Sequence, residues 1–345
     1  MNAAAKPFDG ENKYIRITDI DEVSSTYDDK DIVSPDGILT DNYAVNDRDI
    51  LLARTGASTG KSYLYRKSDG KLYYAGFLIR ANITEHNPYF VFSQLHTHRY
   101  WRWVSIMSAR SGQPGINSQE YSSFPIFTTS LHEENKIASL LSRLDERIAT
   151  QNKIIEDLKK LKSAIRKRVF TLLKNEHTEN REINQLLDYE QPSAYIVAND
   201  EYSADTTLTP VLTANKGFVL GYTNEDFGIY QKGECIIFDD FTMDTKYVSF
   251  PFKVKSSAIK ILTAKPNVNL RFMFEYLLYL NNKSEEHKRH YISEIASLVI
   301  KLPSKEKQNR IANLMTSLDN KLVLEENIMA RYMDEKRYIL SQMFI

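Results

Sequence analysis

Two long stretches of the chain carry apolar side chains at steps of three and four residues. The positions that share this spacing are Ile137, Leu141, Leu144, Ile148, Ile155 and Leu158 in the first stretch, and Ile311, Met315, Leu318, Leu322 and Tyr332 in the second. Such spacing is typical of a helix with a heptad-like seam. It predicts helices over residues 131–176 and 304–345, each roughly 60 Å long at ~1.5 Å per residue. Because neither helix can bury its seam alone, we expect the two to pack against each other.

The two helical stretches are also repeats of one another. Residues 133–145 align with residues 307–319 at a constant offset of 174, and Asn, Ile, Ala, Leu, Leu and Asp recur identically. Gln151 and Glu325 are separated by the same offset, so both seams have a polar residue at the same level. A polar layer at this level would set the register of the helices at a cost in stability. The pattern is equally compatible with solvent-exposed side chains at these two positions, where the apolar seam rotates around each helix.

The segments between the helices show mixed helix and strand patterns. Strand-like runs cover residues 14–17, 49–53, 62–65, 77–83, 217–220, 235–238, 247–254 and 258–262, and helical patterns cover residues 88–107 and 270–281. We therefore predict an α+β fold with two globular α/β regions, residues 1–130 and 177–303. They are separated by the two long helices, which are expected to form an antiparallel coiled coil with a pseudo-two-fold internal repeat.

Composition places the chain among ordinary globular proteins of two or more domains. It has 345 residues, 42% of them hydrophobic, and 45 basic residues balance 45 acidic ones. Residues 131–176 carry 11 Lys or Arg against 7 Asp or Glu, so positive charge gathers on the first helix. The lone cysteine, Cys235, cannot form an intramolecular disulfide, and no apolar run approaches the ~20 residues of a membrane span. These features predict a cytoplasmic protein without a membrane partner.

Three motifs suggest enzymatic or metal chemistry, and their surroundings argue against each. Residues 55–62 are one residue from a phosphate-binding P-loop, but the strand-like residues 62–65 follow where a helix is needed. Residues 87–90 resemble the tetrapeptide of adenine methyltransferases without its second Pro, and a capping Asn before a first-turn Pro fits them better. Asp239, Asp240 and Asp244 are expected to be solvated loop carboxylates rather than a two-metal site. No His spacing predicts a metal site.

The complete pattern resembles a known family. Each helix follows a stretch like residues 115–126, and the first helix opens with Glu-Asn-Lys-Ile-Ala at residues 134–138 and continues with Leu-Asp-Glu-Arg-Ile at residues 144–148. The run Asp-Ile-Leu-Leu-Ala-Arg-Thr-Gly at residues 49–56 fits as well. By this combination, nearly the whole chain resembles the DNA specificity subunit of a type I restriction–modification system.

The resemblance implies a subunit that is not itself an enzyme. Each globular region would be a target recognition domain that reads one half of a split sequence in double-stranded DNA. The helices would act as a spacer and dock two methyltransferase subunits, which bind S-adenosylmethionine and methylate adenine N6. Restriction subunits, which use ATP and magnesium, would join the same core. Relatives usually carry a longer segment before the strand at residues 14–17, as the second region does over about residues 182–192, so the first region is expected to be truncated, rearranged or given a changed start at its N-terminus.

DNA recognition requires loop side chains that read bases and Lys or Arg side chains that hold phosphates. The candidates in the first region are Arg54, Thr55, Ser58, Thr59, Lys61, Arg80, Arg110, Gln113 and Asn117. Those in the second region are Lys216, Tyr222, Asn224, Lys246, Lys288 and Arg289. The alternative for each of them is a solvated loop residue. With no net charge, the chain alone is expected to bind DNA weakly and in a salt-sensitive way.

Two other classes of protein compete with this interpretation. A standalone DNA-modifying enzyme would need a cofactor loop or a carboxylate cluster, and the sequence offers neither. A coiled-coil scaffold would use the helices without any DNA contact. Methylation mapping with and without the chain separates these classes from a specificity subunit.

Overall fold

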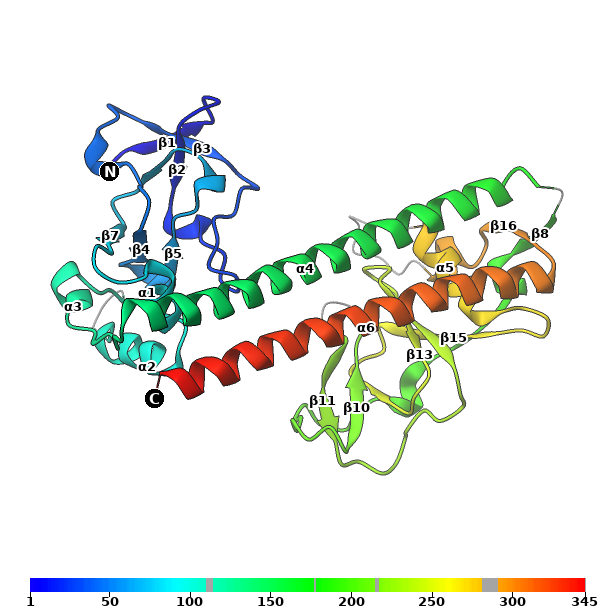
Figure 1. Ribbon diagram of the computed structural model, residues 1–345. Coiled ribbons are helices and arrows are strands. Elements are labelled where there is room, and N and C mark those ends of the chain that lie inside the picture. The colour runs from blue at the N-terminus through cyan, green and yellow to red at the C-terminus, as the bar shows by residue number, and fades with distance from the viewer. Residues whose placement is uncertain (110–113, 177, 215–216, 281–290, 345) are drawn as a thin grey trace. The chain divides into compact units, whose positions relative to one another are not determined.

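The computed structural model describes residues 1–109, 114–176, 178–214, 217–280 and 291–344 (Figure 1). Its α-helices are α1 (Pro88–Gln94), α2 (His98–Met107), α3 (Ser118–Ser122), α4 (Leu131–Leu173), α5 (Leu270–Leu280) and α6 (Lys305–Met343). The strands of the first globular region are β1 (Ala4–Pro7), β2 (Lys13–Ile15), β3 (Val33–Asp36), β4 (Asp49–Ala53), β5 (Ser62–Leu64), β6 (Leu72–Tyr74) and β7 (Leu78–Asn82). The remaining strands are β8 (Glu179–Glu182), β9 (Leu187–Glu190), β10 (Thr209–Leu212), β11 (Val219–Thr223), β12 (Cys235–Asp239), β13 (Thr245–Val248), β14 (Lys253–Val254), β15 (Ile259–Ala264) and β16 (Val299–Leu302).

The chain divides into two compact units. Unit 1 consists of residues 1–155 and 325–345, and unit 2 consists of residues 156–324. Each unit therefore combines one globular region with the first part of one long helix and the last part of the other. Of the helices in the described residues, none is long and apolar enough to cross a bilayer.

The first globular region is built around β4, the central strand of an antiparallel sheet with the order β5-β4-β7. All five residues of β4 are buried. Ile50 and Leu52 pack with the side chains of α1 and α2, whereas Leu51 and Ala53 pack on the opposite face with residues of β2 and β6. A strand covered on both faces needs an uninterrupted apolar run, which explains the sequence of this strand.

The second globular region repeats this plan around β12, in an antiparallel sheet with the order β13-β12-β15-β9. Ile236 and Phe238 pack with α5, and Cys235 and Ile237 belong to a second apolar cluster. The strand β9 is the fourth strand of this sheet, and it pairs with β15 through residues 187–190, which precede the sheet's other strands in the chain. The corresponding sheet of the first region contains three strands within the described residues.

The residues of the predicted seam are buried or half-buried in the structure. The buried members are Leu141, Leu144, Ile155, Ile311 and Met315, and the half-buried members are Ile137, Ile148, Leu158, Leu318, Leu322 and Tyr332. Ion pairs link the two helices within each unit. Lys336 of α6 lies 2.6 Å from Asp145 of α4 in unit 1, and in unit 2 Lys162 of α4 pairs with Asp319 of α6. The repeat offset of 174 relates the two Asp residues and also the two Lys residues, so the ion pairs are equivalent and the helices are antiparallel.

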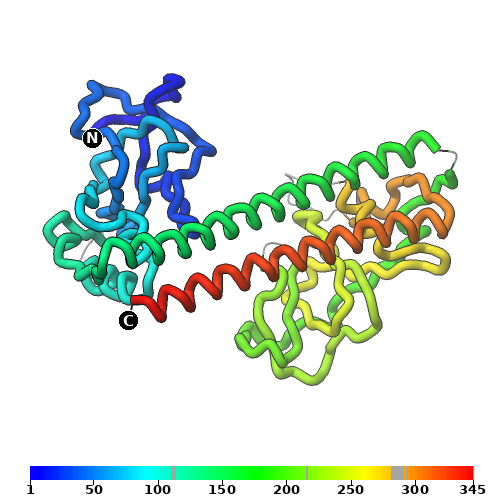
Figure 2. The backbone as a smooth tube through the Cα atoms, in the orientation of Figure 1, coloured from blue at the N-terminus to red at the C-terminus, as the bar shows by residue number. Residues whose placement is uncertain are grey.

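In unit 1, the first globular region is fixed to both helices. The backbone N–H of Asn87 donates to the buried Glu134 at 2.8 Å, and the Asn87 amide donates to Asn135 at 2.7 Å. Phe90 of α1 packs on Phe344 at the end of α6, with ring centroids 5.3 Å apart. Figure 2 shows this end of the chain beside the α1–α2 region.

Unit 2 repeats these contacts with equivalent residues. The backbone N–H of Asn269 donates to Gln308 at 2.9 Å, and its amide donates to Asn309 at 2.8 Å. Phe272 of α5 packs on Phe170 near the end of α4, with centroids 5.5 Å apart. Two regions with diverged sequences are therefore attached to the repeated helices in the same way, so the internal repeat includes these attachments.

Two of the predicted elements are wrong, because each is divided into two elements in the structure. The helix predicted over residues 88–107 is divided into α1 and α2, because the Thr97 hydroxyl accepts from the backbone N–H of Tyr100 and starts a new helix. The strand predicted over residues 247–254 is divided into β13 and β14. Pro251, which has no N–H to donate to a ladder, lies between them.

Candidate nucleic-acid interface

A loop of the first globular region collects several of the predicted DNA contacts. Residues 54–61 connect β4 to β5 and pair with residues 114–117. The N–H of Gly56 donates to the carbonyl of Pro114 at 2.9 Å, and the N–H of Ile116 donates to the carbonyl of Arg54 at 2.9 Å. Asn117 follows directly and caps α3 through its side chain, which accepts from the N–H of Glu120. Arg54, Thr55, Ser58 and Asn117 are thus brought to one edge of the region.

Buried tyrosines hold this loop in place. The carbonyl of Gly60 accepts from the hydroxyl of Tyr100 at 2.8 Å, and its N–H donates to the hydroxyl of Tyr121 at 3.1 Å. That hydroxyl in turn donates to the carbonyl of Ala53 at 2.6 Å, and burial raises the pKa of Tyr121 to about 12. Gly60 has φ +93°, and a Cβ there would lie 2.7 Å from Val104. The loop is therefore a preorganised surface rather than a free tether.

Three other candidates of the first region have partners inside the protein. Thr59 is buried, and its hydroxyl donates to the carbonyl of Gly56 at 2.8 Å, so it closes the turn. The ammonium of Lys61 lies 4.0 Å from Glu22 and is largely covered. Arg80 donates to the carbonyl of Ala44 at 2.9 Å. Arg110 and Gln113 lie outside the described residues.

The candidates of the second region are more dispersed. Tyr222 lies in β11 and exchanges backbone hydrogen bonds with Ser203, and Asn224 is exposed just after that strand. Lys246 lies over the ring of Phe218, at the opposite end of β11, with its Nζ 5.9 Å from the centroid. Lys216, Lys288 and Arg289 lie outside the described residues.

The sequence did not indicate the residue that positions the Asn224 loop. Lys253 of β14 is fully buried, lies 2.6 Å from the carboxylate of Glu225 and donates to the carbonyl of Phe227 at 2.7 Å. The Lys253 side chain holds the pKa of Glu225 below its ordinary value. Only the three-dimensional pairing of β14 with β10 brings this lysine under the loop, so no local motif reveals it.

The sequence motifs that resemble catalytic motifs have structural roles in this fold. Gly56–Ser58 form a short 3-10 turn that leads into the strand β5, so the P-loop-like run has no helix to hold phosphates. The Asn87 side chain caps α1 by accepting from the N–H of Tyr89 and Phe90, which confirms the capping interpretation. Within the described residues, no group of three or more His, Cys, Asp or Glu side chains is placed to hold a metal ion.

The prediction of solvated carboxylates at residues 239–240 is wrong. Asp239 is buried and accepts from the N–H of Phe241 and Thr242, so it forms the turn after β12. Asp240 is buried beside Lys260, at 3.4 Å. The lysine comes from β15, a strand that local sequence does not place beside this turn.

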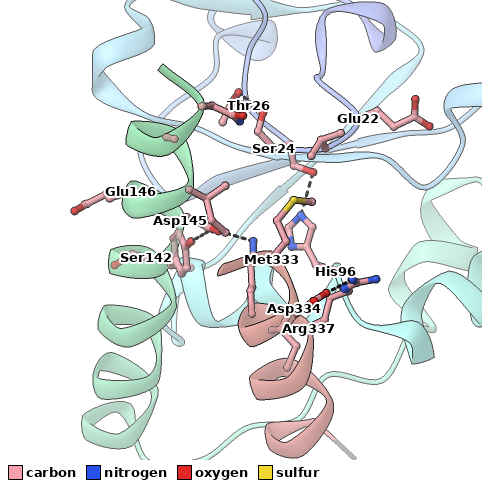
Figure 3. Close-up of a pocket in the computed structure, with 18 of the residues that line it drawn as sticks. Glu22, Ser24, Thr26, His96, Ser142, Asp145, Glu146, Met333, Asp334 and Arg337 are labelled. Carbon is pink, nitrogen blue, oxygen red and sulfur yellow. Dashed lines mark hydrogen bonds and ion pairs between the residues drawn. The ribbon is translucent and has the colours of Figure 1, made fainter. Parts of the chain in front are cut away.

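A cavity of about 660 Å³ lies in unit 1 between residues 22–26, α4 and α6 (Figure 3). Asp145 and Lys336 form its ion pair, and Tyr89 donates to Asp145. His96 lies 3.0 Å from the hydroxyl of Ser25, and burial lowers the pKa of His96 to about 4. The polar groups of the cavity join the first globular region to the helices.

Comparison with known proteins places this architecture in a family. The family described as the type I restriction modification DNA specificity domain matches residues 1–160 and again residues 175–331. The chain belongs to this family. It is 39% identical over 162 residues to the EcoR124I/EcoR124II specificity subunit of Escherichia coli, an alignment that covers 42% of this chain and 40% of the relative.

Solved structures of this family share the fold over nearly the whole chain. The specificity subunit of a type I restriction–modification system from M. genitalium superposes with a TM-score of 0.66 at 16% identity, over 99% of this chain and 90% of that one. A chain from a study of complex assembly and conformational transition in a type I system gives a TM-score of 0.56 at 13% identity, over 96% of this chain and 90% of that one. At these identities the likeness concerns the fold alone.

Proposed function

We propose that this chain is the DNA specificity subunit of a type I restriction–modification complex. Each globular region reads one half of a bipartite target in double-stranded DNA, and the two long helices fix the length of the unread spacer. The chain supplies sequence recognition and no catalytic group. The methyltransferase subunits bind S-adenosylmethionine, and the restriction subunits use ATP and magnesium.

The single observation that carries this proposal is the equivalent attachment of two dissimilar regions to repeated helices. Asn87 and Asn269 make the same hydrogen bonds, and Phe90 and Phe272 make the same ring contacts, although the loops beyond them differ. Two domains that recognise different DNA half-sites need the same attachment to the helices and different loops for base recognition. A scaffold without DNA contacts gives no reason for this division.

The helices also support the docking of two copies of one partner. Leu140 on α4 and Leu314 on α6 are 48% and 44% exposed, and they occupy equivalent positions of the repeat. Packing between the helices does not explain why an exposed leucine occurs at the same position of both repeats. An apolar anchor for a partner protein does explain it, and its repetition corresponds to two methyltransferase subunits.

The decisive experiment is co-expression of the chain with a methyltransferase subunit, followed by mapping of adenine methylation on genomic DNA. We expect a bipartite methylated sequence that disappears when the chain is omitted. Methylation with the same sequence preference in the absence of the chain would exclude the specificity role. Catalysis by the chain alone would instead establish the enzyme alternative.

Docking is tested separately by the substitutions Leu140→Asp and Leu314→Asp. Each should remove one of two bound methyltransferase subunits, and the double variant should remove both, as measured by the mass of the purified complex. Leu161→Asp is the matched control, because Leu161 is 49% exposed but its equivalent position holds Glu335. Full occupancy in the double variant would refute docking through these leucines.

A further inference from the structure

Phe77 is an unusual residue at the edge that carries the predicted DNA contacts. It occupies the turn immediately before β7, and 61% of its surface is exposed. Exposing a phenylalanine to water is unfavourable, and burying its ring would contribute roughly 1.5–3 kcal/mol. An aromatic side chain in this position is suited to a binding partner.

The backbone around Phe77 is fixed on both sides. Its carbonyl accepts from the N–H of Arg54 at 3.0 Å, and the N–H of Leu78 donates to the carbonyl of Ala75 at 2.9 Å. The N–H of the preceding Gly76 donates to the carbonyl of Met1 at 2.8 Å, so the turn is also bonded to the N-terminal segment. A ring on a rigid turn loses little conformational entropy on binding.

The chemical surroundings of Phe77 favour DNA as the partner. Residues 54–61, 75–80 and 114–119 meet at this edge through the pairing of Thr55 with Gly115 and of Ala53 with Leu78. Together these segments contain Arg54, Lys61 and Arg80. The neighbouring carboxylates are engaged, because Glu120 accepts from the N–H of Asn117 and Glu22 lies 4.0 Å from Lys61, whereas Arg54 is exposed. An exposed phenylalanine whose backbone is hydrogen-bonded to that of an exposed arginine is complementary to a polyanion with apolar groups in its grooves.

We propose that Phe77 contacts the 5-methyl group of a thymine in the major groove of the half-site read by the first globular region, with Arg54 beside it. The methyl group is the one apolar feature that distinguishes an A·T pair in that groove, and Phe is among the side chains that contact it. This inference rests on the proposed function and adds to it a specificity-determining residue.

The test uses the chain in complex with its methyltransferase subunit, on the target defined by methylation mapping. Each thymine of the target is replaced in turn by deoxyuridine, which lacks only the methyl group. We expect the wild-type complex to lose affinity about fourfold at one thymine of the first half-site, as for the loss of one buried methyl group. The Phe77→Ala complex should bind more weakly and show no loss on that replacement, whereas Phe77→Leu should retain part of the sensitivity.

Phe8→Ala is the matched control, because Phe8 is a second exposed phenylalanine, 39% exposed, just after β1. It should leave the deoxyuridine effect unchanged. Unaltered sensitivity of the Phe77→Ala complex, a first half-site without thymine, or loss of the methyltransferase subunit from that variant would each overturn the inference. The last outcome would assign Phe77 to a protein interface. Failure of the wild-type complex to select any bipartite sequence would instead reject the proposed function itself.

Discussion

The amide of Gln151 donates to the backbone carbonyl of Glu325 at 3.0 Å and also to its carboxylate, although the two residues occupy the same position of an internal repeat. Both are buried between α4 and α6. Equivalent positions of two antiparallel helices meet only at the centre of the repeat, so this contact marks that centre. The polar layer expected at this level is therefore confirmed, and the exposed alternative is excluded.

We predict that Gln151 and Glu325 are energetically coupled. Gln151→Ala should lower the free energy of unfolding by about 1–3 kcal/mol, because a buried carboxylate loses a donor. A cycle with Glu325→Ala should give a coupling of about 0.5–3 kcal/mol in urea unfolding. Thr150→Ala, at an exposed neighbour on α4, is the control and should change little. A coupling near zero would show that the contact does not stabilise the helix pair.

The contact between Phe90 and Phe344 predicts that the end of α6 stabilises the first globular region. Phe344→Ala should lower stability by about 2–4 kcal/mol, somewhat below the value for a fully enclosed phenylalanine because the final helical turn can fray. Hydrogen exchange should report faster opening of α1 and α2. Met343→Ala, at an exposed neighbouring position, should not change these rates. Unchanged protection of α1 in the Phe344 variant would contradict the contact.

The stability of unit 1 should depend on the protonation of His96. Burial, helped by the cation of Lys336 and opposed by Asp145, lowers the pKa of this imidazole from 6.5 to about 4. Between these two pKa values the unfolded chain binds more protons than the folded one, so stability falls as the pH decreases from about 6.5 to about 4. The expected loss is roughly 1–3 kcal/mol.

The variant His96→Leu tests this expectation, because Leu278 occupies the corresponding position of the second globular region. Urea unfolding at pH 7.5 and 4.5 should show a smaller difference for the variant than for the wild type. His98→Leu, at an exposed position of α2, should retain the full difference. Identical pH dependence of the wild type and the His96 variant would refute a role for this imidazole.

Arg54 should contribute an electrostatic contact to DNA binding. Arg54→Ala is expected to reduce the slope of log K against log salt concentration by about one, because one phosphate contact is lost. Arg80→Ala should have a smaller effect, since the Arg80 guanidinium is engaged with the Ala44 carbonyl. Filter binding of the complex over a salt series measures both slopes. Equal slopes for the wild type and the Arg54 variant would remove this residue from the interface.

The sequence predicted the elements that depend on local periodicity. The helices followed from apolar spacing, β4 and β12 from uninterrupted apolar runs, and the start of α1 from Asn87 and Pro88. The division at Thr97 was missed because a mid-helix threonine and a capping threonine look alike in sequence. The hydroxyl reveals its role only through its bond to the N–H of Tyr100.

The candidate interface was less predictable because it depends on contacts between distant segments. Arg54 and Asn117 lie at one edge only because residues 54–56 pair with residues 114–116. The same folding turns Thr59 and Lys61 toward internal partners, so a basic or hydroxyl side chain in a loop is not sufficient evidence of exposure. Phe77 was missed because it was predicted as the first residue of the strand at residues 77–83, where an apolar side chain is expected to be buried.

The role of the helices as a spacer leads to a prediction about DNA length. Deleting the equivalent heptads 148–154 and 322–328, which removes Gln151 and Glu325 together, shortens each helix by roughly 10 Å while preserving the phase of the apolar seam. At ~3.4 Å per base pair, the preferred unread spacer should become about three base pairs shorter, and both half-sites should stay unchanged. Methylation mapping of the co-expressed complex measures spacer and half-sites together. Deleting the heptad from only one helix should instead mispair the helices and abolish modification. In that variant no single register of the two helices allows both the Lys336–Asp145 and the Lys162–Asp319 ion pair to form. An unchanged spacer in the double deletion would show that the helices do not determine its length.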